Sequence, residues 1–136
     1  MNNFAFYSPT EFVFGKGTES QTAELVKKYK GTKVMIVYGG GSVVRSGLLD
    51  KVKKYLDEAG IAHVELGGIQ PNPTDPKVYE GIELGRREGI DFLLPVGGGS
   101  VIDTAKAIAM GIPYEGDFWD FYMNKVVPEK AIPLGV

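Results

Sequence analysis

The sequence has no cysteine and a single histidine, His63, among its 136 residues. The absence of cysteine excludes a disulfide scaffold and a thiolate metal site. No run of about 18 apolar residues is present, and no charged segment leads into an apolar one at the start, so the sequence predicts neither a transmembrane helix nor a secretory signal. We therefore expect a cytoplasmic protein without a membrane partner.

The sequence also lacks an excess of charge of either sign. Fifteen basic residues against 17 acidic ones leave a formal net charge of -2. No basic stretch carries interleaved aromatic residues, so nucleic acid is not an expected partner. A hydrophobic share of 43% is enough for one domain with its own core. Glycine, in contrast, is abundant: the 19 glycines lie well above the usual share of about 7% and require a local explanation.

Strand-like and helix-like segments alternate along the chain. Apolar, β-branched runs predict strands at 33–38, 61–66 and 90–96. Segments with apolar residues at helical spacing separate these runs, and they end at glycines that we expect to close the helices in a positive-φ conformation. These glycines are Gly31, Gly60, Gly89 and Gly111.

Alternation of this kind predicts an α/β fold. We expect a Rossmann-like, doubly wound, mostly parallel sheet with helices on both faces. The alternating phenylalanines of residues 4–14 predict an antiparallel β-hairpin before that sheet. Thr18 and Gln21 have the spacing of a capping box at the start of the first helix.

One hexapeptide occurs twice, with a difference at its first position only. "YGGGSV" occupies 38–43 and "VGGGSV" occupies 96–101, an offset of 58 residues, and each copy follows a predicted strand. In doubly wound sheets, ligands bind beyond the carboxyl ends of the strands. Glycine turns at that edge remove each Cβ that would keep a phosphate away from backbone N–H groups. The second copy, which runs into the more regular helix, is the better candidate for a pyrophosphate site.

A simpler interpretation of the second copy stays open. Ser100 and Asp103 fit the spacing of a capping box, which would only start a helix. That role does not explain Gly97, Gly98 and Gly99, because a cap needs no glycine triplet. Neither copy matches G-x-G-x-x-G or a P-loop.

Longer segments resemble a known family. "VGGGSVIDTAKAIA" (96–109), "PNPT" (71–74) and "EFVFGKG" (11–17) resemble the amino-terminal domain of the iron-containing, or group III, alcohol dehydrogenases. "YGGGSV" and "YEGDFWDFY" (114–122) are most similar to its butanol dehydrogenase and aldehyde reductase branch. The resemblance covers the whole chain. It implies that residues 1–136 form a dinucleotide-binding domain, and that the chain is a fragment without the family's metal-binding helical domain.

The resemblance also implies a cofactor and its contacts. The cofactor is a nicotinamide dinucleotide lying across the domain. By resemblance, the pyrophosphate would contact Gly97, Gly98, Gly99 and Ser100. The adenosine ribose would face Gly39, Gly40, Gly41 and Ser42. Asp103 would lie beside the cofactor, and Asn72 would lie near it. NAD-dependent members often carry an acidic residue where this chain has Gly39. We therefore favour NADP over NAD, with Ser42 as a donor and Arg45 as a cation for the 2′-phosphate, although Arg45 also fits a solvated surface charge.

The resemblance implies that the catalytic residues lie in the family's helical domain and not in residues 1–136. The family binds a divalent metal, iron or zinc, through an Asp and three His in the helical domain. We therefore expect no catalytic residue and no metal ligand within 1–136, and no turnover by the isolated chain. By resemblance, the full-length enzyme would be a homodimer acting on small primary alcohols and aldehydes. Two alternatives remain: a sister enzyme of the glycerol dehydrogenase or dehydroquinate synthase type, and a non-catalytic flavodoxin-like binding module.

Overall fold

A computed structural model describes residues 17–70, 75–114, 116 and 132–135. Three parallel strands form its sheet in the order β2-β1-β3, with β1 at Lys33–Tyr38, β2 at Ala62–Leu66 and β3 at Phe92–Val96. The predicted α/β alternation and the parallel sheet are confirmed, with the second and third strands starting one or two residues later than expected. The predicted hairpin at 4–14 lies outside the described residues.

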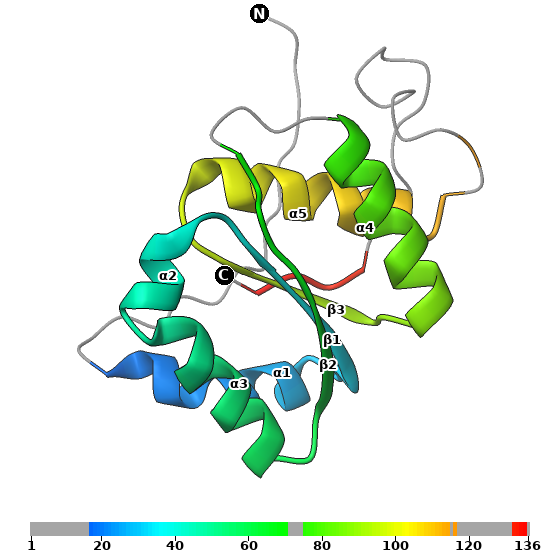
Figure 1. Cartoon of the computed structure of the whole chain (residues 1–136). Coiled ribbons are helices and arrows are strands. Elements are labelled where there is room, and N and C mark those ends of the chain that lie inside the picture. The colour runs from blue at the N-terminus through cyan, green and yellow to red at the C-terminus, as the bar shows by residue number, and fades with distance from the viewer. Residues whose placement is uncertain (1–16, 71–74, 115, 117–131, 136) are drawn as a thin grey trace, which may run out of the picture.

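Helices cover both faces of this sheet (Figure 1). The helical elements are η1, a 3-10 turn at Thr18–Gln21, then α1 at Thr22–Lys28, α2 at Gly41–Arg45, α3 at Leu48–Glu58, α4 at Asp75–Glu88 and α5 at Gly99–Gly111. α1 and α3 lie on one face, and α4 and α5 lie on the other. None of the described helices combines the length and the apolar character that crossing a bilayer requires.

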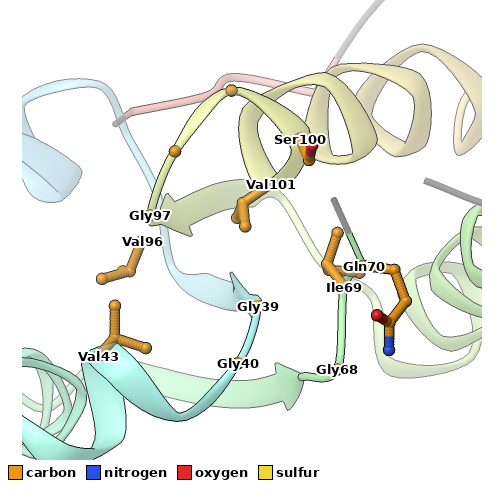
Figure 2. A pocket seen from close by; sticks show the side chains of 12 residues that line it. Gly39, Gly40, Val43, Gly68, Ile69, Gln70, Val96, Gly97, Ser100 and Val101 are labelled. Carbon is orange, nitrogen blue, oxygen red and sulfur yellow. The ribbon is translucent and has the colours of Figure 1, made fainter. Parts of the chain in front are cut away.

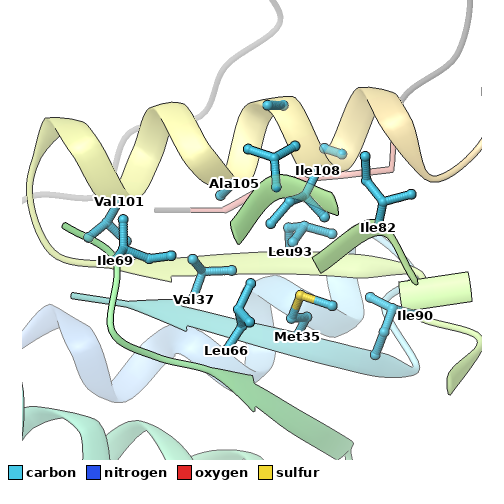
Figure 3. Packing of buried hydrophobic residues seen from close by; sticks show 13 residues of the cluster. Met35, Val37, Leu66, Ile69, Ile82, Ile90, Leu93, Val101, Ala105 and Ile108 are labelled. Atoms are coloured by element: carbon cyan, nitrogen blue, oxygen red, sulfur yellow. The ribbon is translucent and has the colours of Figure 1, made fainter. Parts of the chain in front are cut away.

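Two hydrophobic cores result from the alternation of side chains along the strands. Val34 and Ile36 of β1 face α1 and α3, whereas Met35 and Val37 face α4 and α5. Figure 3 shows the second core, in which α5 lies over the sheet and directs Val101, Ala105 and Ile108 toward the strands. All five residues of β3 are buried. The continuous apolar strands of the sequence therefore belong to a sheet covered on both faces.

Close packing of α4 on α5 depends on glycine. A methyl group added at Gly81 would collide with Ile108 of α5, and one added at Gly85 would collide with Ile112. Arg86, on the same helix, donates from its guanidinium to the carbonyl oxygens of Gly111 (2.9 Å) and Ile112 (3.0 Å). α4 thus positions α5 along its length and satisfies carbonyl groups at its carboxyl end.

The helix ends correct several sequence-based expectations. Gly60 and Gly89 have the predicted positive φ, 71° and 65°. Gly31 does not: Lys30 adopts φ 67°, and Gly31 is required instead because an added methyl would lie 2.6 Å from Val26 Cγ1. Gly111 is the last residue of α5 and is followed by a helical residue rather than closing the helix itself.

The capping box predicted at Thr18 and Gln21 is also wrong. Both residues belong to the 3-10 turn η1, which the backbone enters through Gly17 at φ 79° with no side-chain cap. The α-helix begins one residue after Gln21. The local pattern was correct in predicting a helix start, but the chain reaches it through a tighter turn.

At the amino-terminal edge of the sheet, Asp91 joins β1 to β3. Its carboxylate accepts hydrogen bonds from the backbone N–H groups of Thr32 (2.9 Å) and Lys33 (2.8 Å), and from the Thr32 hydroxyl. Partial burial opposes ionisation of Asp91, but these hydrogen bonds outweigh it and hold the pKa of the carboxyl below its ordinary value. The Lys33 ammonium also pairs with Glu88 at 2.9 Å. These contacts fix the register of the two strands at the edge opposite their carboxyl ends.

Pro95 is accommodated in β3 by its position relative to the neighbouring strands. Leu93 donates its N–H to the Pro133 carbonyl (2.9 Å), on the side of β3 away from β1. Because backbone groups alternate with a period of two, the nitrogen of Pro95 faces that same side. The missing donor therefore costs no hydrogen bond with β1.

Candidate nucleotide-binding site

The spacing of the repeated hexapeptide equals the register of the sheet. β1 and β3 pair from Val34 with Phe92 to Tyr38 with Val96, always 58 residues apart. The two glycine turns therefore leave the same edge of the sheet side by side. From that edge the chain after β1 enters α2 and α3 on one face, and the chain after β3 enters α5 on the other (Figure 1). This divergence is the topological switch point at which doubly wound sheets bind ligands.

A cavity of about 430 Å³ opens at this point, and we call it the glycine hollow. Figure 2 shows the two glycine turns on its rim and the side chain of Val101 directed into it. Residues from both hexapeptides and from the chain after β2 line it: Gly39, Gly40, Val43, Gly68, Ile69, Gln70, Val96, Gly97, Gly98, Gly99, Ser100 and Val101. No charged side chain is among these lining residues.

The second glycine turn presents bare backbone to the glycine hollow. A methyl group added at Gly98 or Gly99 would meet no atom within 4 Å. α5 begins at Gly99, and its first backbone bond runs from the Ile102 N–H to the Gly98 carbonyl (3.1 Å), so the amides of 99–101 precede the helical ladder. Gly97 turns the chain at φ 148°, a conformation that residues with a side chain rarely adopt. The helix amino terminus therefore offers positive charge density to an anion.

The capping interpretation of Ser100 and Asp103 is wrong. Gly98 occupies the cap position without any side-chain cap hydrogen bond, and Ser100 is the second residue of α5. Ser100 is half-buried, lines the glycine hollow, and accepts a hydrogen bond at its carbonyl from the Thr104 hydroxyl (2.9 Å). Asp103 is exposed and does not line the hollow.

The first glycine turn is built differently. Gly39 is packed: its carbonyl accepts the Gly68 N–H (3.1 Å), and an added methyl would lie 3.2 Å from the Ile69 carbonyl oxygen. Gly40, in contrast, faces open space within the lining of the hollow. Gly41 begins α2, and the Arg45 guanidinium occupies the place where its side chain would lie. The two copies are therefore not equivalent.

Of the other predicted contacts, Gly41 and Asp103 do not line the glycine hollow. Gly41 and Ser42 lie in α2, and the contact expected of Ser42 stays a prediction. The chain after the first glycine turn is less regular than the chain after the second, because α2 ends at Arg45 and the next helix starts at Leu48. Asn72 lies outside the described residues.

Sequence analysis missed one wall of the hollow. Gly68, Ile69 and Gln70 follow β2 and lie across the hollow from Gly97 (Figure 2). A signal for this wall was present, because Gly67 and Gly68 form a third run of glycines directly after a predicted parallel strand. All three strands end at the same edge, so the chain after each of them contributes to the site.

The described residues supply no metal centre. Among them, no group of three His, Asp or Glu side chains could hold an ion. His63 lies in β2, where its Nε2 is 2.7 Å from an Asp57 carboxylate oxygen. The part of the chain that the structure describes does not fit the metal of the resembled family.

Comparison with known proteins assigns the family. The sequence profile described as "Iron-containing alcohol dehydrogenase" matches residues 9–136. The chain is 51% identical over 135 residues to the probable NADH-dependent butanol dehydrogenase 2 of Bacillus subtilis (strain 168), covering 99% of this chain and 34% of that protein. It is 38% identical to the NADPH-dependent aldehyde reductase YqhD of Escherichia coli (strain K12), covering 99% of this chain and 35% of that protein.

A solved structure agrees with the sequence comparison. The crystal structure of NADH-dependent butanol dehydrogenase A from Thermotoga maritima superposes with a TM-score of 0.92 at 46% identity, covering 98% of this chain and 34% of that chain. This chain therefore spans about a third of the length of the relatives that it matches. It belongs to the iron-containing alcohol dehydrogenase family.

Proposed function

We propose that residues 1–136 are the dinucleotide-binding domain of a longer, metal-dependent NAD(P) alcohol dehydrogenase. That enzyme would transfer a hydride between the nicotinamide and a small primary alcohol or aldehyde. One observation carries the proposal: bare glycine backbone and the amino terminus of α5 line one cavity at the switch point of a parallel sheet. The names of the relatives, butanol dehydrogenases and an aldehyde reductase, support the substrate class.

The chain's own residues would bind and orient the cofactor. The backbone N–H groups of Gly98, Gly99 and Ser100 would donate to the pyrophosphate oxygens, where the absence of Cβ atoms at both glycines allows close approach. Val96 and Val101 would exclude water from the apolar side of the hollow. A bound nicotinamide dinucleotide supplies the hydride donor and acceptor.

We propose that the catalytic metal of the enzyme is bound outside the described residues. Because these residues do not fit a metal site, iron or zinc would be held in the two thirds of the relatives' length that this chain does not cover. We expect the chain alone to bind nucleotide weakly and to show no alcohol oxidation. We also propose a cytoplasmic homodimer for the full-length enzyme, which light scattering of that protein would test.

We further propose that NADP is preferred over NAD. No carboxylate follows β1 at Gly39 to repel a 2′-phosphate, and the Arg45 guanidinium folds back over Gly41 at the start of α2. NAD is the second candidate, favoured by the names of the relatives from Bacillus subtilis and Thermotoga maritima, which are NADH-dependent butanol dehydrogenases. Arg45→Gln should weaken NADPH binding about tenfold, because it removes a charge-assisted contact, and should leave NADH binding unchanged. Equal effects on both nucleotides would contradict the assignment of Arg45.

Calorimetric titration of the chain with NADPH, NADH and FMN tests the proposed function. We expect binding of at least one nicotinamide dinucleotide and none of FMN. Preference for FMN would instead support the flavodoxin-like binding module. The sister-enzyme alternative is tested with the full-length protein. Oxidation of a primary alcohol by that protein would support our proposal. Dinucleotide binding without oxidation of a primary alcohol would support the sister enzyme.

A further inference from the structure

The wall of the glycine hollow that follows β2 is held on one side by β1. We call residues 67–70 the wall loop. Gly68 donates its N–H to the Gly39 carbonyl (3.1 Å), and Ile69 donates to the Tyr38 carbonyl (3.3 Å). These two bonds lie beyond the last strand pair, Val37 with Leu66, and hold a turn in which Gly68 has φ 76°. They attach the wall loop to the first glycine turn but leave its opposite side, toward α4, to be held by other contacts.

Lys77 provides that second attachment. It is the third residue of α4, and its ammonium donates a hydrogen bond to the Gly67 carbonyl (3.0 Å). The same Nζ lies 3.7 Å from the position that a side chain at Gly68 would occupy. Gly68 itself lines the glycine hollow. The ammonium is therefore directly behind the backbone that forms this wall.

The charge of Lys77 is only partly neutralised. Its carboxylate neighbour, Glu80, is 3.4 Å away, and the Glu80 side chain is 57% exposed, so the pair is weak and screened by water. An ammonium carries three donors, and the contacts above give it two acceptors. Because the lining contains no charged side chain, Lys77 adds positive potential to a cavity that otherwise attracts anions through backbone dipoles alone.

We propose that Lys77 is a positioning residue for the dinucleotide, which holds the wall loop in its binding conformation and attracts the phosphates by its charge. This inference depends on the proposed function, since it concerns the same cavity. Its two parts have separate consequences: loss of the hydrogen bond should reduce affinity at every salt concentration, whereas loss of the charge should reduce the dependence of affinity on salt.

The experiment compares three variants of Lys77 with two controls by calorimetric titration of NADPH at low and high salt. Lys77→Met should weaken binding about tenfold, the effect of losing one charged hydrogen-bonding group, and should flatten the salt dependence. Lys77→Arg, which keeps charge and donors, should recover most of the affinity. Lys77→Gln, which keeps a donor without the charge, should flatten the salt dependence as well.

Two controls separate this role from helix stability and from net charge. Glu80→Gln removes the ion pair within α4 and should bind NADPH as tightly as the unaltered chain or more tightly. Lys54→Met removes the same charge from an exposed pair on α3, where Lys54 lies 3.9 Å from Glu58, and should leave binding unchanged. Melting curves of every variant show whether it is folded at the assay temperature.

Three results would overturn the inference: unchanged affinity in Lys77→Met and Lys77→Gln, an equal loss in Glu80→Gln, or an equal loss in Lys54→Met. If Lys77→Met is unfolded at the assay temperature, the Gln and Arg variants decide the question by the same criteria. Failure of the unaltered chain to bind any dinucleotide would instead refute the proposed function, so the two failures are distinguishable.

Discussion

Replacing Gly99 with alanine should weaken dinucleotide binding without lowering the free energy of unfolding. A glycine with only a structural role would not show this combination. Gly99 is the first residue of α5, its φ is not in the left-handed region, and an added methyl would meet no atom within 4 Å. Alanine is a better helix former than glycine, by about 1 kcal/mol within a helix and by less in its first turn. Gly99→Ala should therefore leave the free energy of unfolding unchanged or raise it by up to about 1 kcal/mol.

Dinucleotide binding should change in the opposite direction. The added methyl would project into space that the proposed function assigns to the pyrophosphate. Displacing one phosphate oxygen from a backbone N–H costs a charge-assisted hydrogen bond, about 1.5–3 kcal/mol, which corresponds to a roughly tenfold to hundredfold loss of affinity. Urea denaturation measures the first quantity, and calorimetric titration with NADPH and NADH measures the second.

Gly60→Ala is the matched control, because it makes the same chemical change at the end of α3, outside the glycine hollow. Gly60 has φ 71°, so alanine there should lower the free energy of unfolding by about 1 kcal/mol. The folded fraction of this variant should bind dinucleotide with unchanged affinity. The reasoning would be refuted if Gly99→Ala bound as tightly as the unaltered chain, or if both variants lost affinity in proportion to stability.

Two further predictions concern the scaffold. Asp91→Ala removes the acceptor shared by Thr32 and Lys33 and should destabilise the chain by about 2 kcal/mol at neutral pH. Because the pKa of Asp91 is lowered on folding, its contribution is present above the unfolded value and is lost as the pH falls, so urea denaturation should show the two proteins converging below about pH 4. Gly81→Val should cost about 1–3 kcal/mol in the same assay, since its side chain collides with Ile108; an unchanged stability would contradict the packing of α4 on α5.

Local patterns in the sequence predicted the elements well but predicted their ends less well. The boundaries of β1 were predicted without error because a continuous apolar run between charged and glycine residues has few alternatives. Gly31 and Gly111 were expected to close helices, but the conformation there depends on tertiary packing. A methyl group added at Gly31 would lie 3.0 Å from Phe92 Cδ2 of β3, and the positive φ is found at Lys30 instead.

The candidate site was predictable only where it follows from sheet topology. The offset of 58 residues between the hexapeptides is visible in the sequence. Because β1 and β3 pair with the same offset, the two glycine turns lie side by side. The wall loop was missed although two glycines follow the predicted strand, because its place beside the first glycine turn depends on a hydrogen bond from Gly68 to Gly39 that no local pattern shows. Lys77 and Asp91 were missed for the same reason, since each acts on a residue that no local pattern connects to it.

A direct test of the central claim is the backbone amide spectrum of the ¹⁵N-labelled chain during titration with NADP⁺. Our account predicts that the largest changes in amide chemical shift occur at residues 97–100 and at Gly40, with smaller changes in the wall loop. Saturable binding that leaves these amides unmoved, with the largest changes on a different edge of the sheet, would contradict it.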